Sequence, residues 1–353
     1  MKNVLIAMSG GVDSAVAALL LKNQGYSVGG VTMKVWSDKK DVSDSDKTPD
    51  GNCLDAMKIA ELLGFEHHIV SFGEIFRRNV VNKFLKDYAN GSTPNPCVEC
   101  NKTIKFGALY DCAAALGYDA FATGHYARIE KNANGDFLLR KAKDENKDQT
   151  YFLWAIKKEI LPSVLFPLGE YSKAQIRELA FENGFFNADR SDSQDICFIK
   201  DGDYAKFITE RSSKKFNQGD FVDIHGNVLG KHSGIINYTI GQRKGLGIAF
   251  GVPMFVGGKD AYKNTVTLCS DAQLYKDTLT ASDINILVDE SFEKPLRLQA
   301  KIRYRHSPAT ATVVKTDTDT LSVKFDLPQR AIAPGQSLVL YDGDTVVGGG
   351  IIR

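Results

Sequence analysis

Short apolar runs alternate with longer segments of helical periodicity through the first two hundred residues. This alternation is typical of a parallel sheet covered by helices on both faces. Gly25 and Gly64 follow the two clearest helical segments, at positions where helices commonly end. We therefore predict an α/β fold with strands at residues 4–8, 28–35, 68–70 and 120–122 and with helices at residues 15–22 and 54–63.

Two polar segments interrupt this pattern. Residues 37–52 are rich in Asp, Lys and Ser, so we expect a surface loop there. The Asn134-Gly135 pair separates residues 126–130 from residues 137–140. That spacing predicts a short β-hairpin inserted near the end of the sheet.

The pattern changes after about residue 205, where long helical periods give way to short alternating segments separated by Gly, Asn and Asp. From residue 296 onward the expected strands are short and evenly spaced, which indicates a small all-β barrel or sandwich. We therefore divide the chain into residues 1–204, a small middle domain at 205–275, and a C-terminal β domain at 276–353.

Composition narrows the class of protein. The 353 residues include 44 Lys and Arg against 43 Asp and Glu, so any nucleic-acid site must be a local patch. No apolar run approaches the roughly 20 residues that cross a bilayer, and the first apolar run leads directly into glycines, as a strand does and a signal peptide does not. Six scattered cysteines do not suit a secreted disulfide scaffold. We expect a cytoplasmic protein with no membrane partner.

A glycine-rich loop follows the first predicted strand and precedes a helix, in the sequence Ser9-Gly10-Gly11-Val12-Asp13-Ser14. Adjacent glycines let bare backbone N–H groups approach a ligand, and a helix N-terminus adds partial positive charge, so phosphate is the expected ligand. Asp13 suits a magnesium ion or a helix cap. The loop holds no Lys or Arg and lacks the GxxxxGK[ST] pattern, which argues against a P-loop NTPase. A plain strand-turn-helix is the alternative.

Cys97 and Cys100 lie just ahead of a helical run that we expect to begin near Lys102, where partial positive charge would favour the thiolate form. With Cys197 they could exchange sulfur as a persulfide and a resolving thiol. Zinc is an alternative, although a second CxxC is absent, and a [4Fe-4S] cluster on Cys97, Cys100 and Cys197 is another. We expect Cys112 to be a small buried hydrophobe and assign no role to it, Cys53 or Cys269.

SGGVDS resembles the pyrophosphate loop of the ATP pyrophosphatase superfamily. Together with TPNPCVECNKTIKF, ATGHYAR, KDQTYFL, SQDICFI, YTIGQRKGLGI and KIRYR, it resembles the bacterial tRNA-specific 2-thiouridylase family along essentially the whole chain. The resemblance implies an adenine nucleotide hydrolase-like PP-loop domain, a middle domain and a C-terminal β-barrel. It implies that ATP and Mg²⁺ are used to make 2-thiouridine at the wobble position of tRNAs for Lys, Glu and Gln.

The same resemblance implies roles for individual residues. Cys100 would be the nucleophile and Cys197 the persulfide carrier, while Cys97 stands where some members have aspartate. The implied ATP-binding residues are Ala7, Met8, Ser9, Gly10, Gly11, Val12, Asp13, Ser14, Met33 and Gly124. The residues implied to contact the target base or the tRNA are Asn95, Pro96, Cys97, His125, Lys147, Asp148, Gln149, Tyr304, Arg305 and Gln336.

The chemistry of uracil fits this assignment, because its C2 carbonyl is a poor electrophile until AMP is placed on O2. Sulfur then arrives as a persulfide on Cys197, from a cysteine desulfurase or a relay protein. Either the terminal sulfur attacks C2 directly, or Cys100 first releases hydrosulfide that attacks; both routes end in a Cys100–Cys197 disulfide.

A local basic patch could bind the RNA. Residues 297–305 alternate basic and apolar side chains, so a strand there would present a nearly all-basic face. Its members are Arg297, Gln299, Lys301, Arg303 and Arg305, and Gln242-Arg243-Lys244 would add charge from the middle domain. A solvated strand face is the alternative.

Two other functions use some of these features. A different adenylating enzyme, such as an amide ligase or a lysidine-type tRNA synthetase, would not need the cysteines. A noncatalytic RNA-binding protein would use them only to hold a metal.

Overall fold

The computed structural model describes residues 2–36, 49–190, 196–199, 202–248 and 251–353. Its first domain is an α/β domain whose central sheet pairs in parallel throughout, as the alternation predicted. The strands, in spatial order, are β3 (His67–Ser71), β2 (Ser27–Lys34), β1 (Asn3–Ala7), β4 (Ala120–Thr123) and β7 (Val164–Leu165).

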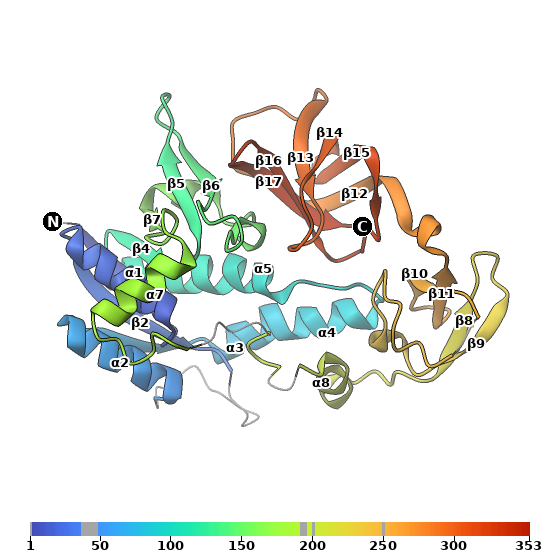
Figure 1. Ribbon diagram of the computed structural model, residues 1–353, viewed down its shortest axis with the longest axis horizontal. Helices are drawn as coiled ribbons and strands as arrows, with labels where there is room; N and C mark the ends of the chain where they lie inside the picture. The colour runs from blue at the N-terminus through green and yellow to red at the C-terminus, as the bar shows by residue number, and fades with distance from the viewer. Residues whose placement is uncertain (1, 37–48, 191–195, 200–201, 249–250) are drawn as a thin grey trace.

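Helices cover both faces of this sheet (Figure 1). Because side chains alternate along β1, Val4 and Ile6 pack toward α1 and α7, while Leu5 packs toward η2 and α6. The helical elements are α1 (Val12–Asn23), α2 (Gly51–Leu63), α3 (Gly73–Phe76), η1 (Arg77–Val81), α4 (Asn82–Ala89), α5 (Pro96–Cys100), η2 (Asn101–Leu109), α6 (Tyr110–Ala115), η3 (Thr150–Phe152), η4 (Lys158–Ser163) and α7 (Lys173–Glu182).

The helix ends follow local capping chemistry. Asp50 accepts a hydrogen bond of 2.9 Å from the Cys53 amide at the start of α2, and Gly64 ends it with φ +70°. The predicted loop at 37–52 therefore ends two residues early, because Asn52 lies inside α2. Residues 37–48 of that segment lie outside the described part of the chain.

The strand order creates a switch point between β1 and β4, since the chain builds β2 and β3 on one side of β1 and then returns to the other. In such open parallel sheets a ligand crevice lies beyond the carboxyl ends of the strands at this point. At this switch point the glycine-rich loop follows the carboxyl end of β1, and Gly124 follows the carboxyl end of β4.

The two cysteines at 97 and 100 lie inside a helix and not ahead of one. α5 begins at Pro96, six residues before the start near Lys102 that we expected, and continues into the π-helical segment η2. A kink at Phe106 and Gly107 separates this run from α6. Asn95 caps it by accepting a 3.1 Å hydrogen bond from the Cys97 amide, and Pro96 occupies the first turn. An N-cap Asn followed by Pro is the start signal that the sequence carried and our prediction overlooked.

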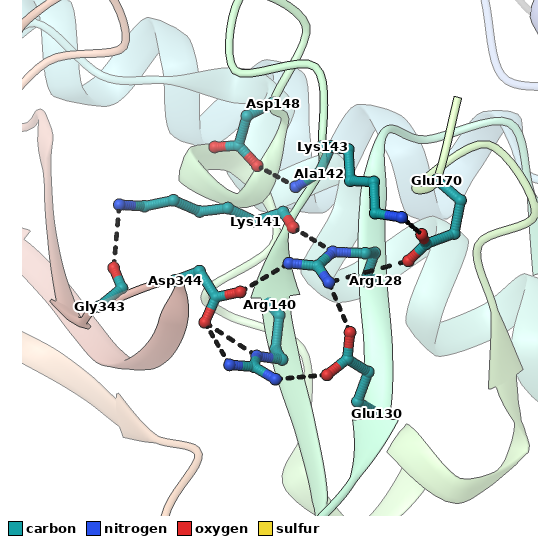
Figure 2. A network of polar contacts seen from close by, with 10 residues as sticks. All are labelled: Arg128, Glu130, Arg140, Lys141, Ala142, Lys143, Asp148, Glu170, Gly343 and Asp344. Atoms are coloured by element: carbon teal, nitrogen blue, oxygen red, sulfur yellow. Dashed lines mark hydrogen bonds and ion pairs between the residues drawn. The ribbon is translucent and has the colours of Figure 1, made fainter. Parts of the chain in front are cut away.

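The predicted hairpin exists as β5 (Ala127–Lys131) and β6 (Phe137–Lys141), but it does not extend the parallel sheet. It stands beside the C-terminal barrel in Figure 1 and pairs with strand β17 (Thr345–Ile352) of that barrel at Arg140 and Thr345. Figure 2 shows the charges that hold this junction: Arg128 contacts Asp344 at 2.6 Å, and Arg140 donates to the other oxygen of the same carboxylate from Nε at 2.9 Å. Glu130 contacts both arginines.

Asp344→Asn should loosen this junction in a pH-dependent way. Burial alone raises the pKa of Asp344, but hydrogen bonds from Arg140 and Arg128 outweigh it and leave the pKa below 3.8. The carboxylate therefore stabilises the fold above the unfolded pKa, and this stabilisation disappears as pH falls through the lower folded pKa. We expect a loss of about 1 kcal/mol at pH 7, since the side chain is partly exposed, and a progressively smaller loss as the pH falls toward the folded pKa.

Urea unfolding of both proteins between pH 3 and pH 7 measures this difference. Asp342→Asn, an exposed carboxylate at the same barrel turn, is the matched control. A destabilisation by Asp344→Asn that is the same at both ends of the pH range would show that the ion pairs do not cause it.

The middle domain begins with a helix, in contrast to the loss of helical periodicity expected there. α8 (Tyr204–Arg211) buries Phe207 against Phe84 and Phe198 of the first domain. The sheet that follows contains β8 (Gly219–Val222), β9 (Val228–His232), β10 (Phe255–Asp260) and β11 (Thr265–Cys269), with the short turns η5 (Ile235–Asn237) and η6 (Asp271–Leu274).

The C-terminal domain is a closed barrel, which decides between the barrel and the sandwich. Its antiparallel strands close on themselves because β12 pairs with both β15 and β17. The strands are β12 (Tyr275–Ile286), β13 (Leu296–Lys301), β14 (Ala309–Asp317), β15 (Thr320–Arg330), β16 (Ser337–Asp342) and β17. Among all described residues, no helix has the length and apolar character needed to span a membrane.

Candidate active site

A cavity of about 340 Å³ lies at the switch point of the parallel sheet. It joins the glycine-rich loop, the ends of β2 and β4, and the segment that carries Cys197. Of the residues implied for ATP, the target base or sulfur, the following line it: Ala7, Met8, Ser9, Asp13, Ser14, Met33, Gly124, His125, Gln149 and Cys197. Residues that are far apart in the sequence of the first domain therefore meet at one ligand-sized space.

The loop between β1 and α1 has the backbone that an anion site needs. Gly10 adopts φ +73°, and a Cβ there would lie 2.6 Å from the Asn52 carbonyl oxygen, so glycine is required. Gly11 stands at the N-cap of α1 without a side-chain cap. The first N–H groups of the helix are thus directed to this end, where they can bind phosphate.

Asp13 neither caps α1 nor stands alone. Its Oδ1 accepts a 2.7 Å contact from Lys173 Nζ and a 2.9 Å hydrogen bond from the Tyr126 hydroxyl. Lys173 is only 12% exposed and comes from the first turn of α7. Lys173 therefore places a positive charge beside the loop, although the six residues of the loop contain no lysine.

The turn after β4 approaches this loop closely. A Cβ on Gly124 would lie 2.9 Å from the Ser14 nitrogen and 3.0 Å from the Asp13 carbonyl carbon. The neighbouring His125 lines the cavity, packs between Phe106 and Phe166, and places Nδ1 2.6 Å from Thr123 Oγ1. Only glycine at 124 lets the two chain segments form one wall.

An aromatic cluster positions Cys197. The next residue, Phe198, is buried and packs against Phe76, Phe84 and Trp36. Cys197 itself is exposed toward the cavity, whereas Cys100 is buried in α5. Residues 193–195 of the SQDICFI motif lie outside the described residues.

The structure brings the three cysteines of interest together, and it corrects their expected ionisation. Each thiol is near enough to influence another, since Cys97 and Cys197 both raise the pKa of Cys100. Burial is the larger cause and raises the pKa of Cys97 and Cys197 as well, and that of Cys100 to about 12. The helix N-terminus therefore does not hold a thiolate here, because Cys100 lies in a buried turn. Lys105 opposes the shift at all three thiols.

The remaining cysteines are placed as follows. Cys53 and Cys269 are buried, while Cys112 is half-buried and not the fully buried hydrophobe that we expected. Among the side chains that the structure describes, no three His, Cys, Asp or Glu residues form a group able to hold a metal ion. The described cysteines thus do not fit an iron–sulfur cluster, and we derive no step from one.

Residues 147–149 were expected to approach tRNA. The Asp148 side chain instead stabilises the fold. It is 6% exposed, and its carboxylate accepts hydrogen bonds from the Ala142 amide and from Thr150 (Figure 2 shows the first). Gln149 instead lines the cavity while its Oε1 accepts from the Tyr126 amide. Lys147 lies one residue before this buried turn.

Two of the barrel residues expected to contact tRNA pack against the first domain. Gln336 donates a 2.7 Å hydrogen bond to the Thr93 carbonyl, two residues before Asn95. Tyr304 is half-buried and packs against Phe152 with ring centres 4.5 Å apart and ring planes tilted by 44°, and Arg305 is exposed. These contacts join the barrel to the segment that precedes α5 and to η3.

The all-basic strand face is only partly present. β13 ends at Lys301, so Arg303 and Arg305 lie in the turn beyond it. Arg297 pairs with Asp326, and Arg303 donates to the carbonyls of Ile240 and Ala331, linking the middle domain to the barrel. Burial of Leu298, Ala300 and Ile302 follows the predicted alternation. The charges on this strand are therefore largely used within the protein.

Sequence patterns did not reveal several cavity residues: Lys34, Trp36, Asp50, Asn52, Lys105 and Thr123. Lys105 lies five residues after Cys100 in a π-helical segment, a spacing that helical periodicity does not associate with one face. Asp50 and Asn52 lie within residues 37–52, the segment that we assigned to a polar loop. Capping of α2 by Asp50 was the one local signal available.

Comparison with known families matches all three parts of the chain. Residues 2–201 match the family described as tRNA methyl transferase HUP domain, residues 205–270 its PRC-barrel domain, and residues 276–352 an aminomethyltransferase beta-barrel domain.

Individual relatives match from end to end. The chain is 49% identical to the tRNA-specific 2-thiouridylase MnmA of Clostridioides difficile, over 100% of this chain and 98% of that protein. It is 46% identical to the protein of the same name from Acetivibrio thermocellus, over 100% and 99%. A solved 4-thiouridine synthetase in complex with RNA and bound ATP aligns with 53% of this chain and 42% of its own at 19% identity, with a TM-score of 0.35, too low to carry an argument.

Proposed function

The chain belongs to the tRNA-specific 2-thiouridylase family, and we propose from this premise that it adenylates O2 of the wobble uridine in tRNAs for Lys, Glu and Gln and replaces that oxygen with sulfur. It is thus a sulfurtransferase that forms 2-thiouridine in tRNA. The observation that carries the finer proposal is the exposure of Cys197 to the same cavity as the glycine-rich loop.

We base the reaction on the full-length relatives and not on the words methyl transferase in the family description. Three thiols beside a nucleotide-sized cavity supply sulfur chemistry directly. An amide ligase or a lysidine-type synthetase would use the cavity but leave Cys97, Cys100 and Cys197 without a role.

ATP fits the cavity by the chemistry of its walls. The N–H groups at the start of α1 can hold pyrophosphate as it leaves, and Lys173 adds a positive charge beside them. Val31 to Met33 line the side where adenine would lie. Mg²⁺ bound with ATP would neutralise phosphate charge. Asp13 is the carboxylate that would hold this ion.

Sulfur transfer follows adenylation. A persulfide on Cys197 supplies the sulfur, either by direct attack of its terminal atom on C2 or after Cys100 has released it as hydrosulfide. AMP leaves with O2 in both routes, and a Cys100–Cys197 disulfide remains for an external dithiol to reduce. The persulfide comes from a cysteine desulfurase or a relay protein, and exposure of Cys197 leaves it accessible to such a donor.

The target base must leave its stack to enter the cavity, which costs less in an anticodon loop than in a duplex. We propose that Asn95, Pro96 and Cys97 contact this base from the start of α5. Lys147, His125, Tyr304, Arg305 and Gln336 would contact the surrounding RNA.

The protein incubated with ATP, Mg²⁺, a persulfide donor and unmodified tRNA with a wobble uridine should produce 2-thiouridine, AMP and pyrophosphate. Mass spectrometry of the digested tRNA detects the nucleoside, and omission of ATP is the control. Consumption of ATP without any thiolated nucleoside would overturn the proposed reaction. An anaerobic absorption spectrum without iron–sulfur bands is expected alongside.

Arg305→Ala should weaken tRNA binding in a salt-dependent manner. Loss of one phosphate contact lowers the slope of log Kd against log salt concentration by roughly 0.7 to 0.9. Arg297→Ala is the matched control, because this arginine is paired with Asp326. Binding titrations between 50 and 300 mM salt measure both slopes, and equal slopes for Arg305→Ala and the native protein would remove Arg305 from the interface.

A further inference from the structure

Lys105 comes close to the thiols because of a local change of helix type. It lies in η2, the π-helical segment that continues α5, and is the fifth residue after Cys100. A π-helix bonds residue i to residue i+5, so these two positions lie over one another across a single turn. In an α-helix the third and fourth residues would occupy that place. Wide turns of this kind recur at functional sites.

The Lys105 ammonium group is held at the cavity wall. Its Nζ lies 3.3 Å from His125 Nε2, and both residues line the cavity together with Cys197. Lysine can only donate, so His125 Nε2 accepts and Nδ1 carries the proton that is shared with Thr123 Oγ1 at 2.6 Å. Burial, and secondarily Lys105, lowers the pKa of His125, so this imidazole stays neutral. It therefore does not compete with Lys105 for an anionic group.

The groups that face Lys105 are mostly thiols. Cys97 and Cys100 lie on the same helical run, Cys197 comes from the segment at residues 196–199, and His125 follows β4. Glu99, the nearby carboxylate on α5, contacts Lys83 at 2.6 Å. A cation held beside these three thiols, of which Cys100 is buried and Cys97 and Cys197 are exposed, stabilises whichever sulfur becomes an anion.

We propose that Lys105 is the positioning residue that holds the anionic sulfur during transfer, keeping it between Cys100, Cys197 and the C2 atom of the adenylated base. The inference rests on the proposed function. It holds for both routes, since the attacking species is an anionic persulfide in one and hydrosulfide in the other.

The atoms balance in the hydrosulfide route as follows. Cys100, having lost its proton to solvent, attacks the inner sulfur of the Cys197 persulfide. The Cys100–Cys197 bond forms, the bond to the terminal sulfur breaks, and hydrosulfide leaves with the electron pair. It then adds to C2, and AMP leaves with O2. An external dithiol reduces the disulfide.

Lys105→Met tests the role through thiol reactivity, which does not depend on tRNA. Iodoacetamide reacts with thiolate, so peptide mass spectrometry after timed labelling reports each cysteine. We expect Cys97 and Cys197 to be labelled about 10-fold more slowly at pH 8, the effect of a pKa higher by about one unit. Lys105→Arg should restore the rate, and Lys102→Met, an exposed lysine on the same helix, should leave it unchanged.

Thiolation assays then separate this inference from the proposed function. The variant should lose kcat by at least about 10-fold with little change in KM for tRNA, while thermal unfolding confirms that it folds. A native protein that makes no 2-thiouridine would overturn the proposed function. A native protein that makes it, with a Lys105→Met variant whose labelling and kcat match the native values, would overturn the inference alone. If Lys105→Met does not fold, Lys105→Gln and Lys105→Arg decide by the same two readouts.

Discussion

Cys197→Ser abolishes 2-thiouridine formation, while a single turnover of the variant still releases pyrophosphate from ATP at close to the native rate and leaves the base adenylated. This outcome is expected because adenylation needs the loop at 9–14, whereas sulfur delivery needs the Cys197 thiol, which comes from a separate segment of the cavity lining. Removal of an essential nucleophile costs roughly 10³-fold or more in rate. Mass spectrometry of tRNA nucleosides and a coupled pyrophosphate assay measure the two activities separately.

Cys100→Ser should give the same split, since Cys100 closes the disulfide that releases sulfur. Cys112→Ser is the matched control, because it makes the same atomic change in α6, in a residue to which we assign no role. Product formation by Cys197→Ser at the native rate would instead favour an adenylating enzyme that does not use cysteine.

Gly124→Ala should reduce ATP affinity by about 100-fold, the effect of displacing a binding group by about 1 Å. The added Cβ would lie 2.9 Å from the Ser14 nitrogen and 3.0 Å from the Asp13 carbonyl carbon. Both are backbone atoms, so the loop that binds phosphate must move as a whole. Isothermal titration with ATP and Mg²⁺ measures the change.

Gly51→Ala is the control for this substitution, because a Cβ on Gly51 meets no atom within 4 Å and its backbone does not require glycine. It should bind ATP as the native protein does. The thermal unfolding midpoint of each variant shows that the fold is retained. Native affinity in a folded Gly124→Ala protein would mean that ATP does not lie against this turn.

Much of the architecture could be predicted because its signals are local. The apolar runs predicted β1, β2 and β4 at the positions where they lie. Gly64 ends α2 with a left-handed φ, which glycine adopts readily because it has no Cβ. The start of α5 was missed although its signal was also local, an Asn cap followed by Pro96. Periodicity alone did not locate it, because the helix continues as a π-helix with a different repeat.

The amino-acid sequence by itself determined the order of strands and helices, the glycine loop and the identity of the cysteines. Turn chemistry and side-chain periodicity act over a few residues, and a single chain displays them directly. Only the tertiary structure decided that Lys173 pairs with Asp13, that the hairpin joins the barrel, and that Lys105 faces the thiols. These contacts join residues far apart in the chain or depend on the local helix type, and packing of the whole domain selects them.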